Sequence, residues 1–134
     1  MSNKIRDYKD LLVWQKALSV IDKIIELIEW LPPGPARDII AKQILGSSTS
    51  VCANIAEGHS SGSSREFNRI LKIAFREAKE TDNWLQVLKR SRKFAQTRII
   101  EKVQIIELEN IEVTKMLRSL KKSIQDSLDL KTNP

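Results

Sequence analysis

The chain has one cysteine, Cys52, and one histidine, His59, among its 134 residues. A single cysteine cannot form an internal disulfide, and the two residues together cannot complete a four-ligand zinc site. Ser–His–Asp and Cys–His catalytic arrangements would both depend on His59, which lies in a Gly/Ser-rich stretch. We therefore expect no catalytic residue, no metal, no cofactor and no enzymatic activity. A third hypothesis is a hydrolase that uses Glu57 and His59.

Glycine, proline and aromatic residues are also scarce, with four glycines, four prolines and 5% aromatics. Few helix breakers and few strand-favouring aromatics point to long helices. The longest uncharged stretch, residues 43–56, is too short and too polar to span a bilayer. The amino-terminal decapeptide MSNKIRDYKD has no apolar run of the kind found in secretory signals. These absences predict a cytoplasmic protein.

The charge balance is basic. Lysine and arginine total 23 against 17 aspartate and glutamate residues, which gives a net charge of +6. Apolar residues make up 41% and charged residues 30% of the chain, as in soluble globular domains. The excess of positive charge suggests a polyanionic partner, although it does not identify one.

Apolar residues recur at helical spacing in four segments. The first predicted helix spans about residues 10–31 and is stopped by the Pro-Pro-Gly-Pro run at 32–35, whose Pro35 suits the first turn of the next helix. The second is expected over about residues 36–57, followed by a loop at 58–62. Its Gly/Ser/Thr-rich middle favours close approach of a neighbouring helix.

The third predicted helix begins at a capping box formed by Ser63 and Glu66 and ends in a basic cluster at residues 89–93. Thr97 is the predicted cap of a fourth helix. Asn110 interrupts the apolar seam of that helix, either as a buried residue that fixes register or oligomeric state, or as part of a frayed, exposed seam. Four amphipathic helices with short links predict an all-α, up-down-up-down four-helix bundle, with one domain over residues 1–128 and a disordered tail over 129–134.

One line of polar residues follows the second helix at steps of four and three. Short hydrogen-bonding side chains on one line suit a tightly packed interface within the bundle or between subunits, although a solvated face is the alternative. The three tryptophans, Trp14, Trp30 and Trp84, are candidate subunit anchors, and Trp14 is equally suited to the core. The predicted interface line consists of Gln43, Ser47, Ser50, Asn54 and Glu57.

A second line, of cations, follows the third helix with the same spacing, nearly opposite its apolar face. From Arg65 to Arg98 there are ten basic and four acidic residues, an excess of six that equals the net charge of the whole chain. At ~1.5 Å per residue the line is about 40 Å long and could track a phosphate backbone; a solvated face is the competing interpretation. The candidate nucleic-acid-binding residues are Arg65, Arg69, Lys72, Arg76, Lys79, Arg90 and Lys93.

Several of these residues together resemble a known family. The resemblance rests on Leu-Val-Trp-Gln-Lys-Ala at 12–17, on Gln43 and Ser50, on Asn-Ile-Ala-Glu-Gly at 54–58, and on Ser64 with Glu66-Phe67. The chain resembles the four-helix bundle proteins encoded in intervening sequences of bacterial 23S rRNA genes. It is also similar to the accessory variability proteins of diversity-generating retroelements. The resemblance implies a small up-down bundle that forms a homopentamer, with a basic surface for nucleic acid and a reverse transcriptase as a partner.

Two functions of different classes follow. The first is a non-enzymatic, homo-oligomeric bundle that binds structured RNA or DNA through the cations of the third helix, as an accessory to a reverse transcriptase or ribonucleoprotein. The alternative is a structural or protein-binding oligomer with no direct nucleic-acid contact. Steep weakening by salt is expected only for phosphate binding.

Overall fold

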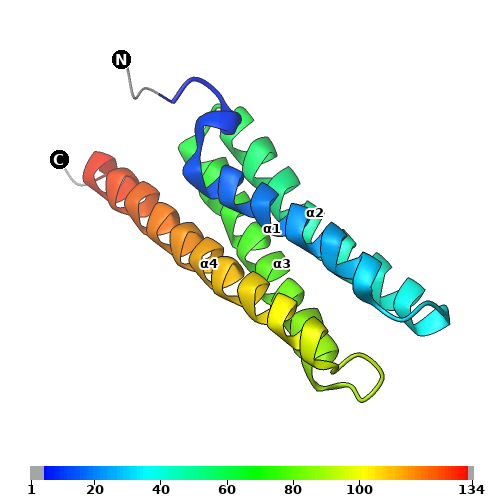
Figure 1. Cartoon of the computed structure of the whole chain (residues 1–134). Helices are drawn as coiled ribbons and strands as arrows, with labels where there is room; N and C mark the ends of the chain where they lie inside the picture. Colours follow the sequence, from blue (N-terminus) through cyan, green and yellow to red (C-terminus); the bar gives the residue numbers. More distant parts are fainter. Residues whose placement is uncertain (1–4, 133–134) are drawn as a thin grey trace.

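The computed structural model describes residues 5–132 and consists of four long helices joined by short links (Figure 1). Successive helices run antiparallel, and packing contacts join α1 to α2, α2 to α3, α3 to α4 and α4 back to α1. The predicted all-α, up-down-up-down bundle is confirmed. The helices are α1 (Leu12–Trp30), α2 (Pro35–Ser60), α3 (Ser64–Arg90) and α4 (Thr97–Thr132).

The start of the bundle is a short 3-10 turn, η1 (Tyr8–Asp10), rather than a continuous helix from Asp10. The side chain of Asp7 accepts a hydrogen bond from the backbone N–H of Lys9 at 2.7 Å, and Asp10 accepts one from the N–H of Asp7 at 3.1 Å. These reciprocal bonds close a capping box. Leu11 then has an extended conformation, so α1 begins two residues later than expected.

The first link behaves as the proline run predicts. Gly34, with φ of 141°, precedes α2, and Pro35 is the first residue of that helix. A proline suits this position because its missing N–H would have no partner inside the helix. At the other end of the bundle, α3 ends at Arg90 and residues 91–96 turn the chain into α4. Thr97 is the first residue of α4 rather than its cap.

The second link differs from the prediction, because α2 continues through Gly58 and His59 to Ser60. The chain turns instead at Gly62, whose φ of 74° lies in the left-handed region that favours glycine. Gly58 has another role: a Cβ at this position would lie 2.8 Å from Cδ1 of Phe67. The absence of a side chain at Gly58 therefore lets the start of α3 approach α2 closely.

Only half of the capping box predicted for α3 forms. Ser63 Oγ accepts a hydrogen bond from the backbone N–H of Glu66 at 3.2 Å, as expected for an N-cap. The Glu66 carboxylate pairs with the Arg69 side chain instead of with the backbone of Ser63.

The core is formed by the predicted apolar stripes of all four helices. The buried positions include Ile24 and Leu27 of α1, Ile44 and Ile55 of α2, Leu71, Leu85 and Leu88 of α3, and Ile99, Val103, Ile106 and Leu117 of α4. Two polar contacts cross it. Ser47 Oγ lies 2.8 Å from Thr81 Oγ1 between α2 and α3, and the Asn110 side chain donates to the Ala78 carbonyl at 3.0 Å. Asn110 is 3% exposed, which excludes the frayed-seam interpretation.

The last helix is longer than expected. It extends to Thr132, so residues 129–132 are helical where the sequence predicts a disordered tail. Residues 133–134 of that tail lie outside the described residues. The carboxyl-terminal turns of α4 lie at the same end of the bundle as the start of α3, which matters for the charged surface described below (Figure 1).

Candidate nucleic-acid interface

The predicted cation line lies on the outer side of α3. Arg65, Arg69, Lys72, Arg76 and Lys79 are all exposed. Their spacing keeps them away from the buried apolar stripe of the same helix, because positions three and four apart share one helical face. We call these five residues the α3 cation line.

Four members of the α3 cation line have no ion pair among residues 5–132. Arg69 is the exception: its Nη2 and Nε lie 2.6 Å and 3.1 Å from the Glu66 carboxylate. The hydrogen bond from Arg69 lowers the pKa of Glu66, so this carboxylate remains charged and offsets Arg69. Arg65, Lys72, Arg76 and Lys79 therefore present positive charge to solvent without an ion-pair partner in the described region.

The line does not extend as far as predicted. Arg90 is exposed at the last position of α3, but Lys93 lies in the turn beyond the helix. Its Nζ is 3.6 Å from the place that a Cβ on Gly34 would occupy, so Lys93 faces the link between α1 and α2. The prediction that Lys93 continues the helical line is wrong, because α3 ends three residues before it.

A cation of α4 that the sequence pattern does not predict borders the same face. Arg118 is exposed and its guanidinium lies 4.8 Å from the centre of the Phe75 ring of α3. This cation–π contact holds the charge over the boundary between the two helices. The helical period alone shows which side of α4 carries Arg118, but it does not show which residue of α3 faces it.

The polar line on α2 divides into buried and exposed members. Ser47 is buried and bonded to Thr81, so it lies in an interface within the bundle. Ser50 and Asn54 are half-buried and hydrogen-bonded to each other, with Asn54 Nδ2 3.0 Å from Ser50 Oγ. Gln43 and Glu57 are exposed. Of the five side chains, Ser47 is therefore the one whose hydrogen bond joins two helices in the described region.

The three tryptophans have different environments. Trp14 packs against the core and makes an edge-to-face contact with Tyr8, with ring centroids 5.3 Å apart. Trp84 is also packed against the core, and its indole N–H is buried without an acceptor among the described residues. Trp30 is 43% exposed and lies beneath two cations of α4, Arg98 and Lys102.

The groups considered for catalysis do not form a site in the described part of the chain. Burial raises the pKa of Cys52 to about 11, so its thiol stays protonated at neutral pH and is a poor nucleophile. His59 packs edge-to-face on Phe67 at 5.7 Å. Glu57 and His59 are two residues apart on a helix, so their side chains point in different directions. Within residues 5–132 no three His, Cys, Asp or Glu residues are grouped to hold a metal ion.

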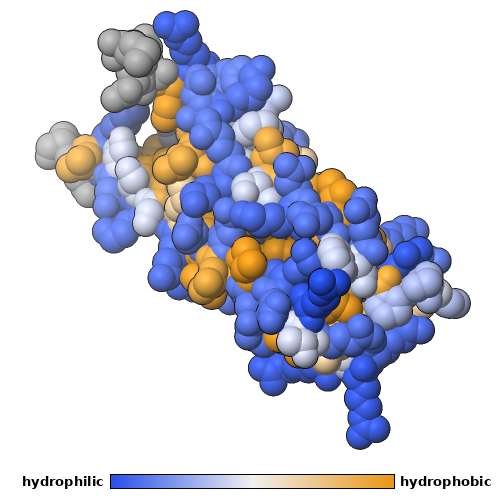
Figure 2. Space-filling model, viewed as in Figure 1, coloured by the Kyte–Doolittle hydropathy of each residue, from blue (hydrophilic) through white to orange (hydrophobic). Residues whose placement is uncertain are grey.

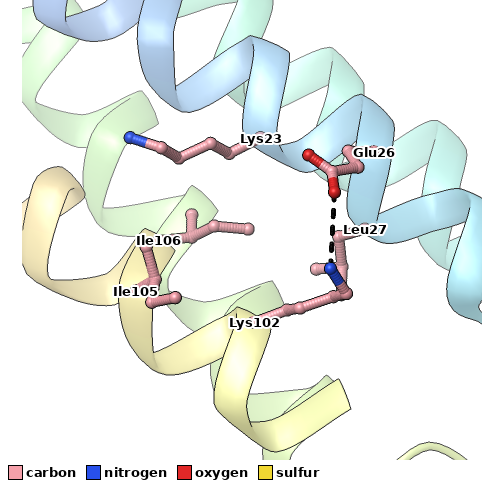
Figure 3. Close-up of a pocket in the computed structure, with 6 residues that line it drawn as sticks. All are labelled: Lys23, Glu26, Leu27, Lys102, Ile105 and Ile106. Carbon is pink, nitrogen blue, oxygen red and sulfur yellow. Dashed lines mark hydrogen bonds and ion pairs between the residues drawn. The ribbon is translucent and has the colours of Figure 1, made fainter. Parts of the chain in front are cut away.

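The boundary between α1 and α4 carries apolar and charged side chains together. Ion pairs join Lys16 to Glu112 at 2.7 Å and Lys23 to Glu109 at 2.9 Å, and these pairs are typical of solvent-exposed helix contacts. A cavity of about 170 Å³ lies along this boundary, where Lys102 pairs with Glu26 at 3.4 Å (Figure 3). Its lining residues are Lys23, Glu26, Leu27, Lys102, Ile105 and Ile106.

Several large apolar side chains on these two helices are exposed. Leu12 is 60%, Ile105 58% and Leu108 67% exposed. Figure 2 shows orange apolar side chains interspersed with blue polar ones over the face that α1 and α4 form. Across the described residues, no helix is both long and apolar enough to cross a membrane.

The fold and its surface define a class: an all-α four-helix bundle protein with a line of exposed cations on its outer face. The family model of the 23S rRNA-intervening sequence proteins matches residues 9–119. The chain therefore belongs to this family, as the Trp-Gln-Lys and Asn-Ile-Ala-Glu-Gly motifs indicated.

A solved structure agrees with this assignment. The crystal structure of a protein with unknown function from the S23 ribosomal protein family of Bacteroides thetaiotaomicron superposes with a TM-score of 0.72 at 35% sequence identity. The similarity covers 83% of this chain and 99% of that one. A comparison with curated proteins gives no match.

Proposed function

We propose that this protein is a non-enzymatic homo-oligomer that binds structured RNA or DNA through the α3 cation line. The observation that carries the proposal is the exposed charge of Arg65, Lys72, Arg76 and Lys79, which share one helical face and have no ion pair in the described region. Such a row of cations releases counterions when it meets a phosphate backbone, and this release is a main source of nucleic-acid affinity.

The chemistry of the line favours binding to the backbone over reading of bases. The line contains no aromatic side chain on which a base could stack. From Arg65 to Lys79 it follows α3 for about 21 Å, at ~1.5 Å per residue. We therefore expect recognition of phosphates and duplex shape, with weak sequence preference.

The proposed assembly is a homopentamer. It is supported by the family resemblance and by the exposed Leu12, Ile105 and Leu108, since apolar surface of this kind is commonly covered in oligomers. The same surface also favours the alternative function, a protein-binding oligomer without nucleic-acid contact. A role as accessory to a reverse transcriptase or ribonucleoprotein rests on the resemblance to accessory variability proteins.

The decisive experiment reverses charge on the line. Fluorescence anisotropy with a labelled RNA duplex and a DNA duplex compares the wild-type protein with a Lys72→Glu/Arg76→Glu double variant. The matched control is Lys42→Glu/Lys115→Glu, which changes the net charge equally at two exposed lysines without ion pairs in the described region. Light scattering measures the assembly of each protein against the 15.4 kDa mass of one chain.

We expect the double variant to lose binding while its assembly mass matches that of the wild type and the control. Equal binding by the double variant and the control would show that the line is irrelevant. An assembled wild-type protein that binds neither duplex would refute nucleic-acid binding and leave the protein-binding alternative.

A further inference from the structure

A concave, cationic groove is lined by residues from the first turns of α3 and the last turns of α4. These turns lie at the end of the bundle opposite the link between α3 and α4 (Figure 1). Its volume is about 270 Å³. Three members of the α3 cation line lie on one side, and Lys121 lies on the other. The main lining residues are Arg65, Asn68, Arg69, Lys72, Lys121 and Gln125.

A hydrogen bond between side-chain amides bridges the two helices at this groove. Asn68 Nδ2 donates to Gln125 Oε1 at 3.1 Å, and Gln125 Nε2 donates to Asp129 Oδ1 at 2.9 Å. Because the Gln125 amide nitrogen is directed to Asp129, its oxygen is left to face α3. The pair therefore links α3 to α4 within the groove that the cations of both helices line.

The charge of the groove is strongly positive. Four cations line it, against the carboxylate of Asp129. The Glu66 carboxylate offsets the positive charge of Arg69. Lys72 and Arg65 have no ion pair in the described part of the chain. Cations on both walls of a concave surface focus the electrostatic potential more than a single exposed row does.

We propose that this groove anchors the phosphodiester backbone of bound nucleic acid, with Lys121 of α4 and Arg65 and Lys72 of α3 contacting phosphates from opposite sides. The inference rests on the proposed function and specifies the site: the strand crosses from α3 onto α4 at this end, instead of following α3 alone. Arg65 supplies planar, bidentate donors suited to phosphate, and the lysines supply point charges.

The position of the groove favours a polymer backbone as its ligand. Lys72 belongs both to the groove and to the α3 cation line, which continues through Arg76 and Lys79. A chain of regularly spaced phosphates can occupy the groove and the line together. This continuity links the concave site to the exposed row on the same side of α3.

The test uses Lys121, because it lies in the groove but not in the α3 cation line. Anisotropy titrations with the labelled RNA and DNA duplexes compare the wild type, Lys121→Glu and Lys115→Glu. Lys115 is the matched control: it is an exposed lysine of the same helix that does not line the groove. Circular dichroism checks that each variant is folded, and Lys121→Gln replaces Lys121→Glu if the latter unfolds.

We expect Lys121→Glu to weaken binding by roughly tenfold and to reduce the salt slope by about one, the effect of losing one phosphate contact. Lys115→Glu should change affinity less than about threefold, as expected for a screened charge outside the contact. If the wild type binds but both variants lose affinity equally, the groove is refuted while the proposed function stands. If the wild type binds neither duplex, both proposals fail.

Discussion

The close approach of α2 and α3 at Gly58 leads to a prediction with an internal control. Replacing a glycine with alanine inside a helix stabilises the helix by about 1 kcal/mol through backbone entropy alone. At Gly58 the new Cβ would lie 2.8 Å from Phe67 Cδ1 and 3.3 Å from Ile70 Cβ. The Phe67 ring can rotate, but the Ile70 Cβ is attached directly to the α3 backbone and moves only with it.

Overpacking of this kind costs about 1 to 3 kcal/mol. Gly58→Ala should therefore lower the free energy of unfolding by about 1 kcal/mol after the helical gain is included. Gly46 lies in the same helix, and a Cβ added there would meet no neighbouring side chain within 4 Å, so Gly46→Ala should raise stability by about 1 kcal/mol. The helical term cancels between the two variants, and the expected difference of about 2 kcal/mol measures the contact with α3 alone.

The assay is urea unfolding followed by circular dichroism, at one fixed protein concentration because assembly also stabilises the folded state. The result that would refute the reasoning is an equal gain in stability for Gly46→Ala and Gly58→Ala. Such a result would mean that α3 does not approach α2 closely at Gly58.

Three further predictions concern buried polar and titratable groups. Asn110→Ala should lower the free energy of unfolding, measured by urea titration, by about 1 to 3 kcal/mol. The variant loses the hydrogen bond to the Ala78 carbonyl and leaves a cavity in the core. An unchanged midpoint of urea unfolding would contradict this contact. Burial opposes the charge of Glu107, but hydrogen bonds from Lys89 and Gln86 outweigh it and lower its pKa. The Glu107 carboxylate should therefore add to the free energy of unfolding at neutral pH, and this stabilisation should be lost as the pH falls below about 4.5. Glu107→Gln should destabilise the protein at pH 7 and have little effect near pH 3. Native Cys52, with a pKa of about 11 against the usual 9.0, should react with a thiol reagent at pH 8 about 100-fold more slowly than after unfolding, and equal rates would contradict its burial.

Much of the fold follows from the sequence because each helix carries its own apolar stripe. Ile24, Leu71 and Val103 are buried as their spacing predicts, and Pro35 begins α2 as expected. The apolar face of α1 is wider than its buried part, because Leu18 and Ile25 are exposed. The second link is harder to predict, because the sequence offers two glycines four residues apart. The structure shows that Gly58 lies where α3 packs closely against α2, and that Gly62 is the residue at which the chain turns between these helices.

The candidate site is predictable in part for the same reason. A helical period fixes which residues share a face of one helix, and the exposed line from Arg65 to Lys79 needs no more information. Lys121 cannot be found this way, since its place opposite Lys72 depends on how α3 and α4 align along their length. The prediction that Lys93 continues the helical line is wrong, because the basic cluster continues beyond Arg90, where the helix ends.

The central claim is that exposed cations of α3 bind phosphates, and the salt dependence of duplex DNA binding tests it most directly. If Arg65, Lys72, Arg76 and Lys79 contact about four phosphates, the slope of log K against log salt should be near −3.6, roughly −0.9 per phosphate. Affinity should then fall on the order of 100-fold between about 50 and 200 mM salt. A slope near zero, or no binding at the lowest salt concentration, would contradict the account.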